Sequence, residues 1–352
     1  MRSEGRPRAA HGRQAGDARG GSAAAPAAGA LRHLALLAYG PDLLAGLADF
    51  VLDGITSGQD VLIALPAGRA AALRDLLGSH PRSVLFADPD DLGRNPARII
   101  PALQSLAAQR TRPVRFVTEP IWAGRTDAEI REVLRHEALA NRALAGSGLA
   151  LLCAYDAGAL PGQALTAAGR THPVLATGRR VVPSMAYQGP AVTPPECDRP
   201  LEPPPPGSYL LGYGTDLRAA RDQVARRAAA AGLSPARVSD LVLAVGELMA
   251  NTLTHTAGGG TIRLWLTPGE LICQIDDDGQ ITDPLAGHLL PDPAQPGGQG
   301  LWLVNQYCDL AEVRSGPRGT TFRLHMRRDA GIAADLTPGI SPVAGYWSGR
   351  SR

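Results

Sequence analysis

A proline-rich segment at residues 186–208 constrains the architecture more than any other feature of the sequence. It contains the pair Pro194-Pro195 and the unbroken run Pro203–Pro206. Proline removes a backbone N–H donor and fixes φ, so such a segment neither continues a helix nor enters a central strand, and it is stiff and extended. We therefore expect two domains, at residues 30–185 and 209–328, joined by this linker.

Both ends of the chain lie outside the two expected domains. Residues 1–29 are rich in Arg, Gly and Ala, residues 329–352 contain Gly and Pro, and neither segment has a hydrophobic period. Such segments bury too little apolar surface to offset the entropy of folding, so we expect a disordered first tail and a loose second one. A basic arm that contacts nucleic acid is the alternative for the first tail. The net charge of only +2 argues against a general nucleic-acid binder.

The cysteine and hydropathy patterns indicate a cytoplasmic protein. The four cysteines are far apart and form no CxxC pair, which argues against a disulfide framework or a zinc site. No run of about 18 apolar residues is present, so we expect no membrane span. The N-terminus also lacks the apolar core of a signal peptide.

The first expected domain alternates short apolar runs with segments of helical spacing. The strand-like runs are 34–39, 60–65, 83–87, 114–119 and 149–155, and the helix-like segments are 43–55, 67–77, 95–108 and 127–144. This alternation predicts an α/β domain with a largely parallel sheet. The domain has no GxxxxGK[ST] sequence: the loop after residues 60–65 reads Pro66-Ala-Gly68-Arg69 and lacks the lysine, so no intact P-loop is present.

Four short words in this domain resemble the MEDS sensory domain. They are Gly93–Ile100, Glu119–Arg125, Arg135–Leu139 and Cys153–Asp156. The resemblance implies a KaiC/RecA-like α/β fold without nucleotide chemistry, and a site that senses a small hydrophobic ligand. The candidate ligand-sensing residues are Glu119, Trp122, His136, Glu137 and Tyr155. The alternative is that they are structural, and since no His/Cys pair has ligand spacing, the sequence argues against a metal site here.

A polar stripe marks one predicted helix of the second domain. Ser234-Pro235 provides an N-cap followed by proline at the first helical position. In the helix that follows, Glu247, Asn251 and His255 are spaced four residues apart, which places them on one stripe beside the apolar face. A solvated helix face is the alternative interpretation of this stripe, and His255 fits a structural role at the helix C-terminus better than a catalytic one.

Three further segments follow this helix in the order of an α+β domain. Two alternating segments around Pro268-Gly269 predict a hairpin that ends in Asp276–Gly279. The glycine-rich loop Pro296–Gly300 leads into an apolar helix, and a last hairpin turns around Ser315–Gly319.

Together these segments resemble the GHKL family of ATPases and kinases. Glu247–Asn251 resembles the N-box, Ile275–Gly279 the first glycine box, Gly297–Val304 the second, and Gly319–Thr321 the terminal threonine motif. One such motif alone is a weak signal, but four in the right order over one domain are specific. The resemblance implies a two-layer α+β sandwich of the Bergerat type that binds ATP and Mg²⁺.

The side chains of the N-box and the first glycine box suit their implied roles. Asn251 offers Mg²⁺ a neutral hard oxygen, and Glu247 is the candidate general base. Asp277 can accept a hydrogen bond from the exocyclic amine of adenine, and Gly279 leaves room where the base lies against the backbone.

The remaining motif residues suit phosphate and adenine contacts. Gly297, Gly298 and Gly300 let backbone N–H groups approach phosphates at a helix N-terminus. Thr320 or Thr321 completes the adenine contact by hydroxyl or water.

The compact form of the second domain favours one branch of the GHKL family. The segment from Gly279 to Gly297 is a short lid, unlike the long lids of gyrase-like and chaperone ATPases, and a proline linker stands where a histidine kinase has its phosphoacceptor helices. The domain thus resembles anti-sigma-factor serine/threonine kinases, in which the N-box glutamate activates a hydroxyl of an anti-anti-sigma partner.

This resemblance implies an anti-sigma factor with protein kinase activity, gated by the first domain, whose partners are an anti-anti-sigma factor, a sigma factor or both. Members often form homodimers. Two alternatives stay open: a regulator that binds ATP and sequesters a partner without catalysis, and a histidine-kinase-like signalling protein.

Overall fold

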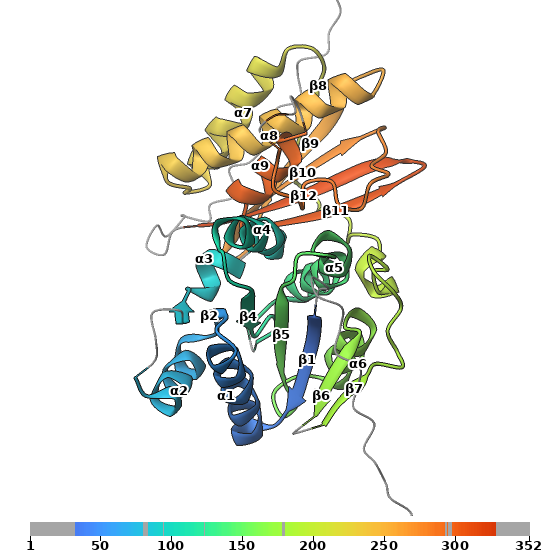
Figure 1. The fold of residues 1–352 in the computed structure, drawn as a ribbon. Helices are drawn as coiled ribbons and strands as arrows, with labels where there is room; N and C mark the ends of the chain where they lie inside the picture. Colours follow the sequence, from blue (N-terminus) through green and yellow to red (C-terminus); the bar gives the residue numbers. More distant parts are fainter. Residues whose placement is uncertain are drawn as a thin grey trace, which may run out of the picture.

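The computed structural model describes residues 32–79, 84–93, 95–122, 124–177, 180–292, 294 and 298–328. The expected tails, 1–29 and 329–352, lie outside these residues. The described chain forms two units, each with its own sheet, stacked one on the other (Figure 1). Within the described residues, no helix is both long and apolar enough to cross a membrane.

The first unit is built on a seven-stranded sheet in the order β3-β2-β4-β5-β1-β6-β7. Its strands are β1 (Arg32–Ala38), β2 (Asp60–Ala64), β3 (Val84–Phe86), β4 (Val114–Thr118), β5 (Ala150–Asp156), β6 (Val174–Thr177) and β7 (Arg180–Pro183). All neighbours are parallel except β7, which runs antiparallel to β6. The predicted α/β domain with a largely parallel sheet is therefore present, with an antiparallel edge strand.

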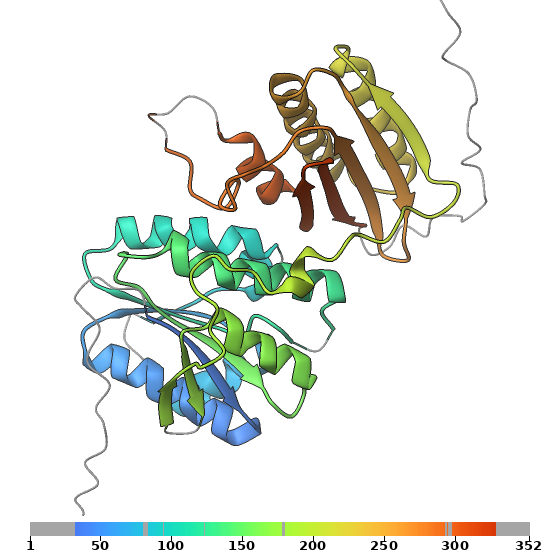
Figure 2. The ribbon, with the colours of Figure 1, turned by 90° about the vertical axis from the view of Figure 1, so that its right-hand side faces the viewer.

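Helices cover both faces of this sheet (Figure 2). They are α1 (Gly40–Thr56), α2 (Ala67–Leu77), α3 (Pro89–Gly93), α4 (Ile99–Gln109), α5 (Asp127–Ala143) and α6 (Gly162–Thr171), with a 3₁₀ turn, η1, at Pro96–Arg98. Alternate residues of β1 point to opposite faces: Leu34 and Leu36 pack with α1, and Ala35 packs with α5 and α6. The strands of a sheet that is covered on both faces must be apolar along nearly their whole length, and the apolar runs of this sequence meet that requirement.

Helix α5 is polar as well as buried. A capping box fixes its start: Thr126 accepts from the backbone of Glu129, whose side chain bonds back to the backbone N–H of Thr126. Four polar side chains of α5, namely Glu129, Glu132, His136 and Glu137, are each less than 8% exposed. Buried polar groups need partners, and α5 finds them in both units.

The second unit is a two-layer α+β sandwich. Its five-stranded antiparallel sheet has the order β11-β12-β10-β9-β8, and α7, α8 and α9 lie on one face (Figure 2). The elements are β8 (Tyr209–Tyr213), α7 (Leu217–Ala230), α8 (Pro235–His255), β9 (Gly260–Leu266), β10 (Glu270–Asp277), α9 (Gly300–Tyr307), β11 (Leu310–Gly316) and β12 (Gly319–Arg327). One apolar core joins the helices to the inner side chains of the sheet.

The segment predicted as a linker is in close contact with both units. The short 3₁₀ turn η2 (Pro195–Asp198) buries Cys197 completely, and the backbone carbonyl of Cys197 accepts a hydrogen bond from Arg135 of α5. The chain then passes the second sheet, where Arg314 and Arg323 donate to the carbonyls of Arg199 and Glu202, at 2.8 and 2.6 Å.

Candidate functional site

Helix α8 and the start of α9 meet at three of the predicted residues. Glu247 and Asn251 are half-buried on one stripe of α8, and Gly300 begins α9 opposite them. A Cβ atom at Gly300 would lie 2.7 Å from Glu247 Oε2 and 3.4 Å from Asn251 Nδ2. A side chain at this position would push the Glu247 carboxylate aside, so the carboxylate, the amide and the helix N-terminus share one small space.

Asp277 stands at the end of β10 and is held in one orientation. Its Oδ2 accepts from Thr252 Oγ1 at 2.7 Å, and Thr252 is in turn bonded to Tyr213 Oη at 2.8 Å. Its Oδ1 accepts from the backbone N–H of Gly279 at 2.8 Å. A Cβ at Gly279 would lie 3.0 Å from that oxygen and 3.1 Å from Thr256 Cγ2, which shows how closely the turn folds against the end of α8.

The two threonines of β12 point to opposite faces of the sheet. Thr320 pairs with Asp277 on the helix-covered face and donates to the carbonyl of Gly279 at 2.7 Å. Thr321 pairs with Asp276 and donates to its carboxylate at 2.7 Å on the outer face, because strand side chains alternate. Of the two threonines predicted for the adenine contact, Thr320 therefore lies beside Asp277 and Thr321 lies on the other face of the sheet.

The glycine-rich loop is described only in part. Gly297 lies outside the described residues. Gly298 has φ of +75°, a conformation that favours glycine, and no atom would obstruct a Cβ there. The loop runs directly into α9, whose first N–H groups have no partner within the helix, as in a phosphate-binding turn.

An apolar cavity lies in the first unit, between the sheet and helices α3, α4 and α5. About 30 Å³ of it is open to the centre of a water-sized molecule, which is room for about two water molecules. Trp122, His136 and Glu137 line the cavity as predicted for the ligand-sensing residues, among apolar neighbours such as Phe116 and Ile100. The guanidinium of Arg125 lies 3.7 Å from the ring centre of Trp122 and holds it in place.

The other two predicted ligand-sensing residues lie outside the cavity lining. Tyr155 is fully buried behind it and donates its hydroxyl to Glu137 at 2.5 Å. Glu119 forms an ion pair with Arg69 at 2.6 Å, and Arg69 also bonds Asp156 at 3.0 Å. Tyr155 thus acts on the cavity through Glu137, and Glu119 belongs to a separate ion-pair network at the end of the sheet.

Family comparisons agree with both halves of this description. Residues 32–173 match the family described as MEDS, MEthanogen/methylotroph, DcmR Sensory domain, and residues 214–326 match the histidine kinase-like ATPase domain. The chain joins a MEDS domain to a histidine kinase-like ATPase domain. Both resemblances predicted from the sequence are thereby confirmed.

Among curated proteins, none matches this chain. A solved structure of the RsbU and RsbW domains of Rv1364c from Mycobacterium tuberculosis matches at 21% identity and a TM-score of 0.28, over 36% of this chain and 34% of that one. The match spans about a third of that protein.

The segment predicted to be the lid of the ATPase domain is docked on the MEDS domain. We name residues 280–292 the lid segment. Leu285 is buried in the MEDS core beside α4 and α5, and the backbone N–H of Leu290 donates to Gln104 Oε1 at 2.8 Å. The ring of His288 lies with its centre 6.1 Å from that of His136, which lines the MEDS cavity. His136 thus stands between the cavity and His288 of the lid segment.

The helix that follows the glycine-rich loop is also held by the MEDS domain. Arg98 of η1 donates to three carbonyls at the C-terminus of α9, those of Asn305, Gln306 and Cys308. A cation at a helix C-terminus satisfies its free carbonyls and complements its dipole. Asn305 itself donates to the carbonyl of Gly287 in the lid segment at 3.0 Å, so α9 and the lid segment are tied together.

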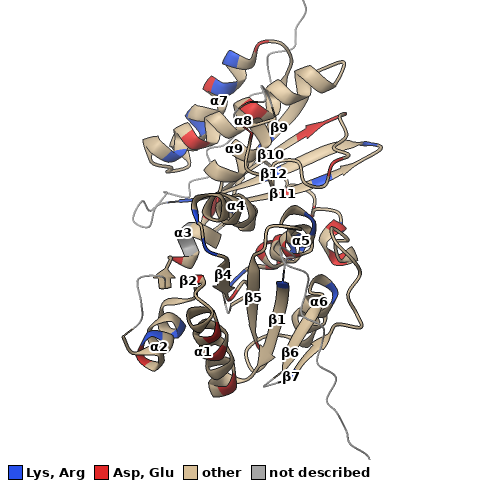
Figure 3. Ribbon diagram, in the orientation of Figure 1, with Lys and Arg blue, Asp and Glu red and all other residues tan. Residues whose placement is uncertain are grey.

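Ion pairs join α5 to the edge of the ATPase sheet, and α5 contains both acidic and basic residues (Figure 3). The pairs are Arg131–Glu312 at 3.1 Å, Glu132–Arg314 at 3.1 Å and Glu129–Arg327 at 2.7 Å. Each is largely buried on its acidic side, with 2–9% of the acidic side chain exposed. Breaking one would leave a buried charge without its partner, which is costly.

Glu312 also belongs to a network with His325 and Glu270. Burial lowers the pKa of His325, but hydrogen bonds to Glu270 and Glu312 outweigh burial and raise the pKa to about 9. Burial raises the pKa of Glu312, but His325, Arg131 and Arg314 outweigh it and lower the pKa to about 2. At neutral pH His325 is therefore an imidazolium beside the ionised carboxylate of Glu312.

Sequence reasoning did not find three buried polar residues of the MEDS domain. His33, Cys153 and His172 lie beside the predicted Glu137, although the sequence spacing argued against a metal site in this domain. Parallel strands bring together residues that are far apart along the chain, which ligand spacing cannot reveal. Burial raises the pKa of Glu137 to about 7 and lowers that of His33 to about 4. The sequence signal that could have revealed the group is a polar residue within an apolar strand, as His33 is in β1.

Proposed function

We propose that the chain is an ATP-dependent protein serine/threonine kinase of the anti-sigma regulatory type, controlled by its MEDS domain. The observation that carries the proposal is the close approach of Gly300 to Glu247 and Asn251. A carboxylate, a neutral amide and an open helix N-terminus converge there. These are the groups with which a protein can activate a hydroxyl, bind Mg²⁺ and hold phosphates.

The residues of the ATPase domain fit ATP with magnesium. The backbone at Gly300 is bare where phosphates would lie, because a side chain there would fill the space in front of Glu247. Asn251 would hold magnesium, which supplies charge neutralisation to the transferring phosphoryl group. We assign adenine recognition to Asp277 and Thr320, which face the same side of the sheet. The chain has no lysine, so the remaining positive charge must come from arginine and backbone N–H groups.

Glu247 performs the proton transfer in this proposal. Its carboxylate accepts the proton from a serine or threonine hydroxyl of the partner while the hydroxyl oxygen forms a bond to the γ-phosphorus. The bond from that phosphorus to the bridging oxygen breaks, and ADP leaves. The products are ADP and a phosphorylated partner, which we take to be an anti-anti-sigma factor. In the state that does not transfer phosphate, the chain binds a sigma factor, which is its second proposed activity.

The docked lid segment supports control by the MEDS domain. A lid must change position when nucleotide enters and leaves, and here Leu285 of the lid segment is buried in the other domain. His136 lies between the cavity and His288 of the lid segment. A small hydrophobic ligand that fills the cavity would repack His136 and α5. It would thereby change the fraction of molecules with the lid segment docked.

Two finer parts of the prediction belong to this proposal. We infer that the MEDS domain is a KaiC/RecA-type fold without nucleotide chemistry, which its parallel strands and the missing GxxxxGK[ST] sequence support. We also infer that phosphate is not passed to a histidine of this chain. Among the described residues, a MEDS domain and the short turn η2 precede the ATPase domain, where a phosphoacceptor helix pair would stand.

The test is a transfer assay with the full chain, [γ-³²P]ATP, Mg²⁺ and purified candidate anti-anti-sigma proteins. Acid-stable label on serine or threonine of one partner supports the proposal, and Glu247→Gln should remove it while calorimetry still detects ATP binding. Asp222→Asn, an exposed change on α7, is the matched control. ATP binding with tight partner binding and no transfer would favour the sequestering regulator, and acid-labile label on the chain itself would favour the histidine-kinase reading.

A further inference from the structure

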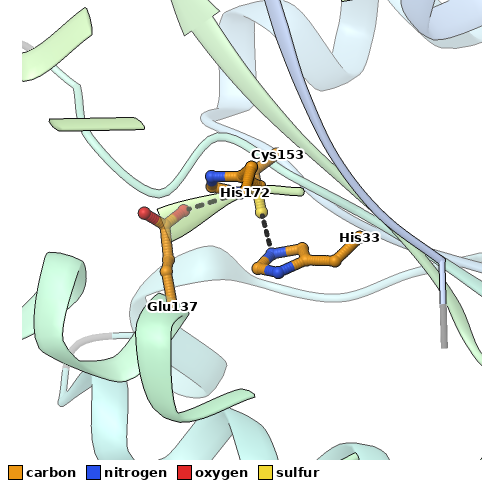
Figure 4. A group of neighbouring side chains, drawn as sticks. All are labelled: His33, Glu137, Cys153 and His172. Atoms are coloured by element: carbon orange, nitrogen blue, oxygen red, sulfur yellow. Dashed lines mark hydrogen bonds and ion pairs between the residues drawn. The ribbon is translucent and has the colours of Figure 1, made fainter. Parts of the chain in front are cut away.

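A second group of functional side chains is sealed inside the MEDS domain, away from the nucleotide site. His33 of β1, Glu137 of α5, Cys153 of β5 and His172, which directly follows α6, point toward one another (Figure 4). One ligand-type atom of each lies within 4.8 Å of the corresponding atoms of the other three. All four side chains are at most 4% exposed.

The spacing of these atoms suits a tetrahedral metal ion. His33 Nε2 lies 3.5 Å from Cys153 Sγ, and His172 Nε2 lies 3.5 Å from Glu137 Oε1. Around a tetrahedral zinc ion with bonds of about 2.0 Å to nitrogen or oxygen and about 2.3 Å to sulfur, neighbouring ligand atoms stand about 3.3–3.5 Å apart. Two of the distances between ligand atoms already have this length, so small side-chain shifts would bring all four atoms into a tetrahedral arrangement.

The hydrogen bonds of His33 aim its free nitrogen at the group. Asn141 Nδ2 donates to the carbonyl of Thr171 at 2.7 Å, so Asn141 Oδ1 must be the atom that faces His33. His33 Nδ1 lies 3.0 Å from that oxygen and therefore carries the proton. The lone pair of His33 Nε2 is left pointing at Cys153.

His172 is oriented in the same way. Its Nδ1 lies 2.9 Å from the carbonyl of Ala168, which can only accept, so Nδ1 carries the proton and Nε2 carries the lone pair. In the described part of the chain, His172 Nε2 has no hydrogen-bond partner although the residue is 0% exposed. A buried lone pair facing a carboxylate is unfavourable unless a positive group lies between them. Metal-binding histidines characteristically have this outer hydrogen bond on the second nitrogen.

Glu137 has its own outer partner as well. Tyr155 Oη donates to Glu137 Oε2 at 2.5 Å, and Thr171 Oγ1 donates to the same oxygen at 3.4 Å. Tyr155 Oη contacts Oε1 as well, and this oxygen, which has a second lone pair, also lies 3.5 Å from His172 Nε2. Three of the four side chains thus have a neighbour that fixes how they point.

From this geometry we infer that His33, Glu137, Cys153 and His172 bind a divalent transition metal ion of the zinc class inside the MEDS domain. Two imidazoles, a thiolate and a carboxylate suit zinc and its chemical neighbours and do not suit Mg²⁺ or Ca²⁺. On binding, the Cys153 thiol releases its proton to solvent, and the thiolate and carboxylate together balance the two positive charges of the ion. Three of the ligands also line the apolar cavity, so the ion would stand at its wall.

The experiment uses the untagged full chain without nucleotide, freed of metal by a chelator and then titrated with Zn²⁺ or Co²⁺ alone. We expect one ion per chain, a rise in the midpoint of thermal unfolding with Zn²⁺, and with Co²⁺ the visible absorption of a tetrahedral site together with a thiolate-to-cobalt band. The Co²⁺ spectrum needs no variant, so it tests the site even if a substitution prevents folding. A folded wild-type chain that takes up no stoichiometric ion, or binds Co²⁺ without the thiolate band, overturns the inference.

Variants identify the ligands. Cys153→Ser and His172→Gln should each weaken Zn²⁺ binding by at least about a hundredfold, and Asn141→Leu, which removes only the outer partner of His33, by about 10- to 100-fold. Cys197→Ser is the matched control, because Cys197 is a buried cysteine of the adjoining linker segment whose hydrogen bond to the Arg131 carbonyl a serine can keep. Wild-type affinity in a folded Cys153→Ser or His172→Gln variant would place the ion elsewhere and reject the site.

Discussion

The two domains hold their polar side chains in opposite ways. In the ATPase domain, Glu247 and Asn251 stand half-buried on a helix surface, and Gly300 keeps the space before them open. In the MEDS domain, the polar group around Glu137 is closed off from solvent and tied to outer hydrogen-bond partners. The difference teaches that a residue of an open site can be substituted without unfolding its domain. A substitution in a sealed polar group, by contrast, leaves a buried partner without its hydrogen bond and lowers stability.

The first and largest expected effect tests the open site. Glu247→Gln should lower the rate of phosphoryl transfer to the partner by about 10²- to 10⁴-fold, because the amide cannot accept the hydroxyl proton. The midpoint of thermal unfolding should stay within a degree or two of wild type, since Glu247 is half-buried and solvated. Radiolabel transfer and scanning calorimetry measure the two quantities. A Glu247→Gln variant that transfers phosphate at the wild-type rate, or whose unfolding midpoint is many degrees lower, would contradict the contrast between an open and a sealed site.

The second prediction concerns the contact between the domains. Leu285→Ala removes a side chain buried in the MEDS core and should destabilise the docked lid segment by about 2–3 kcal/mol. Hydrogen exchange should then quicken at the backbone of residues 280–292. Leu289→Ala is the control, because Leu289 is 37% exposed in the same segment. Equal exchange in the two variants would mean that the lid segment does not depend on this contact.

The third prediction uses the charged network at the domain boundary. The pKa of His325 is raised to about 9, so its contribution to stability is complete below the unfolded value near 6.5 and is lost as the pH rises through 9. We expect the free energy of unfolding to fall by about 2 kcal/mol over this range, less than the full shift allows because Glu270 is partly exposed to solvent. Denaturant titrations from pH 6 to pH 10 give the profile. His325→Gln should flatten it, and a variant with the wild-type slope would assign the loss to another group.

The smallest expected effect is on nucleotide affinity. Gly300→Ala places a methyl group 2.7 Å from Glu247 Oε2, and the carboxylate must move to relieve the contact. ATP affinity measured by calorimetry should fall about tenfold, which corresponds to about 1.4 kcal/mol. Gly269→Ala, where no atom lies within 4 Å of the new methyl group, should bind ATP as wild type does. Equal affinities for the two variants would show that the space at Gly300 is not used by nucleotide.

The sequence predicted most of the framework because the framework depends on local patterns. Helix α2 was expected at 67–77 and is found at Ala67–Leu77, and α5 was expected at 127–144 and ends one residue earlier. The Ser234-Pro235 start of α8 was also correct. Helix α6 and strands β6, β7 and β8 were missed, since α6 is a short Ala- and Gly-rich segment and β8 follows directly on the prolines.

The two sites differ in how far the sequence could reveal them. Residues of the candidate nucleotide site lie in four compact motifs, so their types and order could be recognised in the sequence, although only the observed register shows which of Thr320 and Thr321 lies beside Asp277. The MEDS group takes its members from three parts of a parallel sheet domain and from α5. No spacing rule connects His33 with His172, and only the folded sheet brings them together.

The burial of Leu285 in a neighbouring domain has a consequence for biochemistry done on fragments. An isolated ATPase domain would expose that leucine to water and would leave Arg314 and Arg327 without their carboxylate partners on α5. If the MEDS domain controls the nucleotide site as proposed, such a truncated protein would lack that control. Rates measured on it would then be the reference against which the effect of the MEDS domain in the intact chain is measured.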